Sequence, residues 1–154
     1  MKPYLFLLIC CLTYLSFGQT KTIYPPFLSI KDVTFKSAGI TLEGTIYKPR
    51  NPHAALVLVH GSGQETRMLR MASILAEKGI AVLTYDKRGV GKSDGIYAGP
   101  EVGTNNIDSA NLNLLALDAS AAFNTLLRHL SRKDMHLGLM GFSQAGWIIP
   151  MAAK

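Results

Sequence analysis

Cysteine is almost absent from this sequence, and so are the residue clusters that bind metals. The two cysteines, Cys10 and Cys11, both lie in an apolar stretch near the N-terminus. The rest of the chain therefore cannot form disulfides, use a thiol in catalysis or bind a metal through cysteine. The sequence also contains no H-E-x-x-H motif or comparable ligand spacing. A metal hydrolase is thus not supported, and we expect no metal or other cofactor.

Runs of charge of one sign are missing as well. The formal net charge is +6, but the basic residues are scattered and form no stripe that could follow a nucleic-acid backbone or an anionic membrane. We therefore predict no nucleic-acid partner. With 48% hydrophobic and 17% charged residues, the composition is typical of one globular domain with a real core.

The first 18 residues have the pattern of a secretory signal peptide. Lys2 supplies a positive charge, Tyr4 to Leu15 is almost wholly apolar, and Ser16 and Gly18 are small residues before a possible cleavage site. An uncleaved membrane anchor is the alternative, but about a dozen apolar residues are short for the ~20 that span a bilayer. We expect cleavage before Gln19, a secreted or periplasmic protein, and no stable membrane anchor after cleavage.

An extended lead-in and a hairpin are predicted to follow. Residues 19–28 contain Pro25 and Pro26, and proline fixes φ and removes a backbone donor. The predicted domain covers residues 29–154. It begins with two strands, residues 29–37 and 40–47, in which apolar and polar residues alternate and which form a hairpin.

Buried strands and amphipathic helices alternate after the hairpin. Continuous apolar runs, typical of strands buried on both faces of a parallel sheet, occupy residues 54–59, 80–85 and 136–140. Apolar residues at helical spacing predict helices at residues 66–78, 108–130 (with Asp108 as a possible cap) and from the turn after residue 141 to Lys154. This order predicts an α/β fold with a mixed, mostly parallel sheet and helices on both faces.

Ser143 is the candidate nucleophile. It follows a buried strand and precedes a helix, so the chain must turn sharply there and present the serine Oγ above the sheet. Gly141 provides the small residue two positions before. Ala145 replaces the second glycine of the G-x-S-x-G pattern, and Gly146 comes one place later. The alternative is that Ser143 only caps the last helix, since serine is a favoured N-cap.

A second turn decides between these interpretations. Acyl transfer needs two N–H donors at the oxyanion, one after the nucleophile and one from the turn after the first buried parallel strand. Gln144 and Ser62 are the predicted donors. Gly61 and Gly63 allow the backbone of that turn to approach a substrate. The pairing of this turn with Ser143 favours a serine hydrolase.

Three segments carry a resemblance to a known family. LVLVHGSG, LTYDKRGVGKSDG and LGLMGFSQAGW resemble the α/β-hydrolase superfamily, most of all its secreted bacterial esterase-like and serine-peptidase-like members. The resemblance implies the strand order 1-2-4-3-5, Ser143 as nucleophile, Ser62 and Gln144 as oxyanion donors and a structural role for His60. In that family the catalytic triad follows the chain order Ser, acid, His.

The acid and the histidine have no counterpart here, because no Asp, Glu or His follows Ser143. We therefore interpret the sequence as the N-terminal part of such a domain, with its last strands and two triad residues missing. The predicted activity is hydrolysis of carboxylic esters, on a small-molecule or peptide acyl substrate. There are two alternatives: a catalytically inert module, or a serine peptidase if the domain is completed.

The segment from Asp86 to Ser93 ends in Gly-Lys-Ser and must be compared with a phosphate-binding loop. The pattern G-x-x-x-x-G-K-[ST] needs glycine where this chain has Asp86, whose charge would repel phosphate. Nucleotide binding is therefore disfavoured. We expect a loop at the catalytic end of the sheet whose shape depends on an Asp86–Arg88 pair.

Overall fold

The computed structural model describes residues 27–98, 109–131 and 135–154. The predicted signal peptide, most of the lead-in and the predicted helix cap at Asp108 lie outside the described residues. Within those three ranges, no helix has both the length and the apolar character needed to cross a bilayer.

The N-terminal hairpin forms as predicted. Strand β1 (Leu28–Ser37) pairs antiparallel with β2 (Ile40–Pro49), in a register that runs from Leu28 opposite Pro49 to Ser37 opposite Ile40. Ala38 and Gly39, the two residues between the strands, have φ of 44° and 83°. Two positive φ values are the mark of a type I′ turn, whose twist matches that of the flanking strands.

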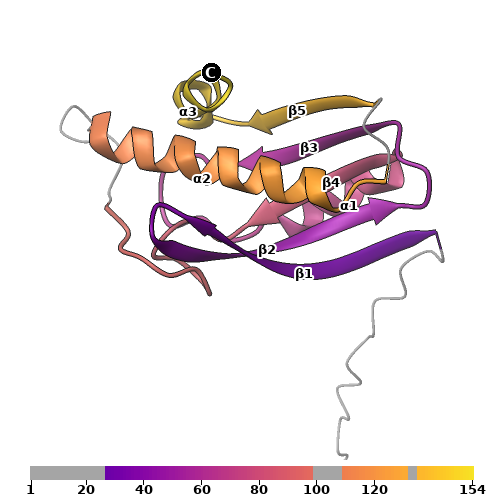
Figure 1. Ribbon diagram of the computed structural model, residues 1–154, viewed down its shortest axis with the longest axis horizontal. Helices are drawn as coiled ribbons and strands as arrows, with labels where there is room; N and C mark the ends of the chain where they lie inside the picture. Colours follow the sequence, from indigo (N-terminus) through magenta and orange to yellow (C-terminus); the bar gives the residue numbers. More distant parts are fainter. Residues whose placement is uncertain (1–26, 99–108, 132–134) are drawn as a thin grey trace, which may run out of the picture.

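The hairpin continues into a five-stranded sheet of order β1-β2-β4-β3-β5, which confirms the predicted order (Figure 1). Strands β3 (Ala54–Val59), β4 (Ile80–Tyr85) and β5 (His136–Gly141) are parallel, and β2 joins β4 antiparallel. The C-terminal ends of the three parallel strands therefore lie at one edge of the sheet, where ligands of such folds bind.

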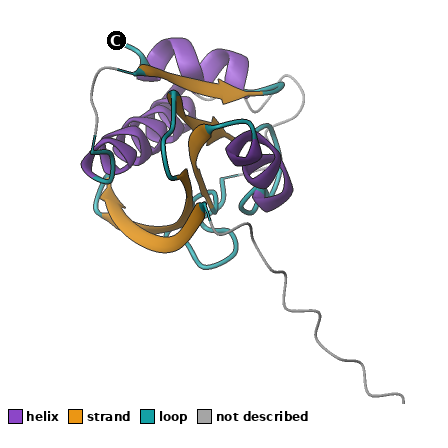
Figure 2. Cartoon of the chain, turned by 90° about the vertical axis from the view of Figure 1, so that its right-hand side faces the viewer, coloured by secondary structure: helices purple, strands orange, loops and turns teal. Residues whose placement is uncertain are grey.

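Helices cover both faces of the sheet (Figure 2). Helix α1 (Leu69–Glu77) packs on one face, and α2 (Ser109–Arg128) and α3 (Ala145–Ala152) pack on the other. Side chains of a strand point alternately to the two faces, so Leu58 joins the cluster under α1 while its neighbours Val57 and Val59 join the larger core under α2 and α3.

Helix α1 begins three residues later than the predicted start at residue 66. The backbone N–H of Arg67 donates to Asp86 Oδ1 at 2.9 Å, and that of Met68 donates to Thr84 Oγ1 at 2.8 Å. These tertiary hydrogen bonds hold the preceding segment against the end of β4. Helical periodicity in the sequence extends through the segment and could not reveal these contacts.

The predicted pair between Asp86 and Arg88 is wrong. Arg88 instead forms two hydrogen bonds with Asp118 on α2, Nε to Oδ2 at 2.7 Å and Nη2 to Oδ1 at 2.6 Å. Asp86 pairs with Arg67. The chain turns at Arg88 and Gly89, where Gly89 has a φ of 69°, so Asp86 and Arg88 do not share one face as alternate residues of a strand would.

The buried pair yields a first prediction. We expect Asp118→Ala to lower the free energy of unfolding by about 3–5 kcal/mol, because it leaves the Arg88 charge buried without its carboxylate. Asp32→Ala is the matched control: its carboxylate also pairs with an arginine, Arg67, but is 73% exposed, so we expect a loss below about 1 kcal/mol. Urea unfolding measures both. Equal losses would contradict the prediction.

Candidate active site

Ser143 lies in a sharp turn between β5 and α3. Its φ is 55°, in the left-handed region that non-glycine residues avoid because Cβ approaches the backbone oxygen. Such a strained backbone fits the sharp strand-to-helix turn predicted for a nucleophile. A serine that only caps a helix has extended backbone geometry with negative φ, so the positive φ disfavours the capping alternative. Strain of this kind is typical of functional sites.

The close contact of strand and helix explains both Gly141 and the unusual Ala145. A Cβ added at Gly141 would overlap the Cβ of Ala145 and the carbonyl oxygen of Val59. Ala145 is fully buried, and its methyl occupies the space that the missing side chain of Gly141 leaves. Gly146 has nothing within 4 Å of an added Cβ, so it does not take over the role of the motif's second glycine.

The turn after β3 lies against the Ser143 turn. A Cβ added at Gly61 would lie 3.4 Å from the Phe142 carbonyl oxygen and 3.7 Å from Ser143 Cβ. Gly63 has a φ of 98°, a conformation that glycine adopts readily. The structure thus brings the predicted turn with Gly61, Ser62 and Gly63 beside the candidate nucleophile and Gln144.

His60 is buried beneath this turn. Its Nε2 lies 2.6 Å from the Tyr85 carbonyl oxygen, and its ring packs edge-on against the Tyr85 ring with centroids 4.5 Å apart. Desolvation by burial lowers the pKa of His60 to about 4, with a smaller contribution from the Lys87 charge, although the hydrogen bond to Tyr85 raises it. At neutral pH His60 is therefore uncharged, and its geometry supports the structural role that the resemblance implies.

The remaining histidines are not at this edge of the sheet. The sequence has four, and all lie within the described residues. His53 precedes β3 and its backbone N–H donates to Gly79. His136 starts β5 opposite Ala54, at the other end of that strand from Gly141. His129, just after α2, lies with Nδ1 2.9 Å from the Thr125 carbonyl oxygen. The described residues also contain no group of three or more His, Cys, Asp or Glu arranged to hold a metal ion.

Lys87 is a residue that sequence reasoning missed. Its side chain is 1% exposed, and its Nζ donates to the carbonyl oxygens of Gly61 at 2.9 Å and Gly63 at 3.3 Å, and to Gln144 Oε1 at 3.2 Å. The sequence offered one signal, a lysine two positions after a buried strand, in a loop predicted to lie at the catalytic end of the sheet. That signal does not show which way the side chain points.

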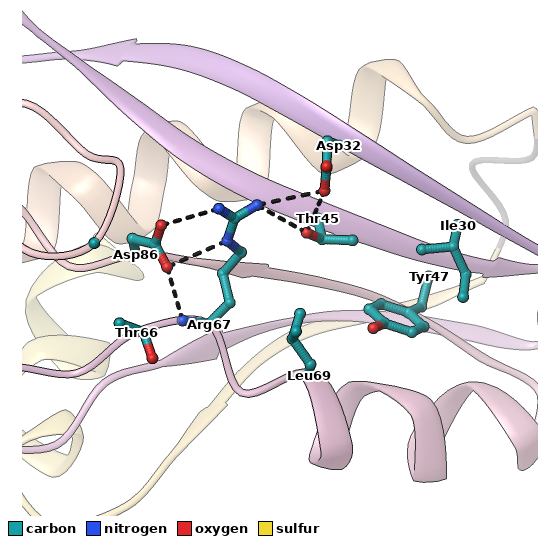
Figure 3. A pocket seen from close by; sticks show the side chains of 9 residues that line it. Ile30, Asp32, Thr45, Tyr47, Thr66, Arg67, Leu69 and Asp86 are labelled. Carbon is teal, nitrogen blue, oxygen red and sulfur yellow. Dashed lines mark hydrogen bonds and ion pairs between the residues drawn. The ribbon is translucent and has the colours of Figure 1, made fainter. Parts of the chain in front are cut away.

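Asp86 and Arg67 form a second polar cluster at the same edge (Figure 3). Asp86 accepts hydrogen bonds from the backbone N–H and guanidinium of Arg67 and from the backbone N–H of Lys92. Burial alone would raise the pKa of Asp86, but these donors outweigh it and lower the pKa below its ordinary value.

The same cluster explains the Gly-Lys-Ser segment. A Cβ added at Gly91 would lie 2.7 Å from the Asp86 carboxylate, and Ser93 Oγ donates to the Asp86 carbonyl oxygen at 2.6 Å. The loop therefore wraps around the chain's own Asp86 carboxylate. A phosphate-binding loop would instead use its backbone N–H groups to enclose a bound phosphate.

Comparison with known proteins agrees with this geometry. The sequence pattern of the serine aminopeptidase S33 family matches residues 50–152, which is more than half of the chain. The chain belongs to this family of α/β-hydrolases. No curated protein matches the sequence significantly.

Solved α/β-hydrolases share the fold of this family member. The α/β-hydrolase GrgF from Penicillium sp. sh18 is 26% identical with a TM-score of 0.62, and the match covers 82% of this chain and 42% of GrgF. The Pyrococcus furiosus esterase Pf2001 is 26% identical with a TM-score of 0.55, over 76% and 44% of the two chains. A third structure is P91, a dienelactone hydrolase-like promiscuous phosphotriesterase from metagenomic libraries. It is 18% identical with a TM-score of 0.59, and it shares the fold over 82% of this chain and 54% of P91. The chain thus spans less than half the length of GrgF and Pf2001.

Gly141 gives a prediction about the turn. We expect Gly141→Ala to lower the free energy of unfolding by about 1–3 kcal/mol or more, because the new methyl meets Ala145 and a backbone carbonyl that cannot move aside. Gly138→Ala, in the same strand with nothing within 4 Å of an added Cβ, should change it by about 0.5 kcal/mol or less. Urea midpoints of the two variants test this, and equal midpoints would refute it.

His60 gives a prediction about pH. Between pH 6.5 and about 4, the unfolded chain binds a proton at His60 that the native chain does not, so stability falls as the pH drops through this window. A pKa lowered from 6.5 to about 4 corresponds to about 3 kcal/mol, at about 1.4 kcal/mol per unit.

We therefore expect the wild type to lose about 3 kcal/mol more than His60→Gln between pH 7 and pH 4. The hydrogen-bond donors around Asp86 lower its pKa, and because both proteins contain Asp86, its effect cancels in this comparison. Urea unfolding at several pH values measures the difference, and parallel pH profiles would show that His60 is not protonated on unfolding.

Proposed function

We propose that this chain is the nucleophile-bearing part of a secreted or periplasmic serine hydrolase that acts on carboxylic esters. The observation that carries the proposal is the left-handed backbone of Ser143 at a strand-turn-helix junction. The Gly61 contact to the same turn supports it, because a nucleophile alone does not stabilise the oxyanion that acyl transfer produces.

The proposed chemistry is a two-step acyl transfer. Ser143 Oγ attacks the ester carbonyl carbon as a base takes its proton, and the carbonyl oxygen becomes an oxyanion bound by the backbone N–H groups of Ser62 and Gln144. The C–O bond of the ester then breaks, and the alcohol leaves with the proton. Water hydrolyses the acyl-serine in the reverse sequence of proton transfers and releases the carboxylic acid.

The base and its acid partner are proposed to follow Lys154. His60 is uncharged and bonded to Tyr85, and no Asp, Glu or His follows Ser143 in the sequence. Because the chain spans 42% of GrgF and 44% of Pf2001, a longer protein would have room for both. The alternative is an inert module, in which Ser143 is only an alcohol.

Peptide hydrolysis is the second candidate, because the family that matches is described as serine aminopeptidase. An ester substrate is preferred because Pf2001, 26% identical, is an esterase. Rates on p-nitrophenyl butyrate and on an aminoacyl p-nitroanilide distinguish the two.

Secretion is supported by the signal-like pattern of residues 1–18. It is tested by sequencing the N-terminus of exported protein, which should begin at Gln19.

Covalent labelling tests the nucleophile. We expect a fluorophosphonate probe to label the natural full-length protein and to label Ser143→Ala at background level, because the probe needs an activated serine. Ser29→Ala, which changes an exposed serine on β1, should label like the wild type. Mass spectrometry of the labelled peptide locates the adduct. An unlabelled wild type, or full labelling of Ser143→Ala, would favour the inert module or a different nucleophile.

A further inference from the structure

A single ammonium group lies between the two turns of the proposed oxyanion site. Lys87 is the second residue after β4, and its backbone N–H donates to the Glu65 carbonyl oxygen at 3.0 Å. Its Nζ donates to the carbonyl oxygens of Gly61 and Gly63, the two residues that flank Ser62, and to the Gln144 side chain. Main chain and side chain of one residue therefore hold the turn after β3.

Peptide geometry links the Gly61 contact to the Ser62 N–H. The Gly61 carbonyl and the Ser62 N–H belong to one planar, trans peptide unit, in which the C=O and N–H bonds point in opposite directions. An ammonium that holds this carbonyl from inside the protein therefore directs the N–H away from itself. The contact to Gly63 on the other side of Ser62 further limits rotation of the turn.

The charge of the ammonium also affects the strength of the donor. A hydrogen bond from an ionised donor is stronger than a neutral one, and hydrogen bonds in a chain polarise one another. A cation bound to the Gly61 carbonyl draws electron density toward that oxygen and makes the N–H of the same peptide a better donor to an anion.

The third contact connects this turn to the nucleophile turn. Gln144 is 7% exposed, and its Oε1 accepts from Lys87 Nζ at 3.2 Å. The backbone N–H of the same residue is the second proposed oxyanion donor. The Lys87 ammonium thus sets the distance between two segments that lie about 80 residues apart in the sequence, and the Tyr97 ring adds a cation–π contact at 5.8 Å.

We propose that Lys87 is a positioning residue of the oxyanion site, which aligns and polarises the Ser62 N–H and joins it to the Gln144 turn. This inference rests on the proposed serine hydrolase function. Lys87 does not act as the base, because an ammonium has three donors and no acceptor and here donates to three oxygens. Burying a charge is costly, so a side chain needed only for packing would be apolar.

The test compares Lys87→Met with Lys92→Met in the natural full-length protein. Both variants remove one lysine charge from the same loop, but Lys92 is exposed. Turnover of p-nitrophenyl butyrate gives kcat and KM. Affinity for benzeneboronic acid reports the oxyanion site, because Ser143 Oγ adds to boron, its proton leaves to solvent and the adduct carries a negative charge.

We expect kcat of Lys87→Met to fall by about 10- to 100-fold. Removal of one oxyanion donor typically lowers kcat by about 100- to 1000-fold, and Lys87 acts only through such a donor. Its KM should stay within about two-fold, and boronic acid affinity should fall in parallel with kcat, because the contact matters only when the oxyanion forms. Lys92→Met should match the wild type. Thermal unfolding of each variant confirms that it is folded.

A second variant covers the case in which Lys87→Met does not fold. Gln144→Met keeps the backbone N–H but removes Oε1, and we expect a several-fold loss of kcat with unchanged KM. Wild-type kcat in a folded Lys87→Met or in Gln144→Met, or an increase in KM alone, would overturn the positioning role. Absence of Ser143-dependent turnover in the wild type would overturn the proposed function and this inference with it.

Discussion

Asp86, Lys87 and Arg88 leave the end of β4 in different directions, and each binds a different part of the chain. Asp86 holds Arg67 at the exit of the turn after β3, Lys87 holds that turn and Gln144, and Arg88 holds Asp118 on α2. All three are at least 90% buried. Buried charges destabilise a fold unless each has a suitable partner, so these contacts define the loop conformation and much of the structure at the C-terminal end of the parallel strands.

The pairing of β3 with β5 brings together the two turns of the proposed oxyanion site. In this parallel pair Val59 lies opposite Gly141, so the turns that follow both strands start side by side. Gly141 lies in close contact with Val59 and Ala145, and two residues later Ser143 has its strained φ of 55°. Packing of Ala145 and Ile148 into the main core holds α3 in place and stabilises this conformation against relaxation.

His60 lies at the same end of the sheet in a structural position. Burial keeps this histidine neutral, and its hydrogen bond to Tyr85 joins the ends of β3 and β4. A histidine available as a general base must instead reach the nucleophile and titrate near neutral pH. The His60 position is therefore suited to supporting the turn rather than to accepting a proton from Ser143.

The sequence alone was sufficient for the hairpin, the three parallel strands and the Ser143 turn, because each depends on local signals: alternation, continuous apolar runs and small residues beside a strand end. The family resemblance supplied the strand order. The start of α1, the Arg67–Asp86 and Arg88–Asp118 pairs and the role of Lys87 were decided only by the tertiary structure. Their partners lie 16 to 57 residues away, and no periodicity records the direction in which a side chain leaves a loop.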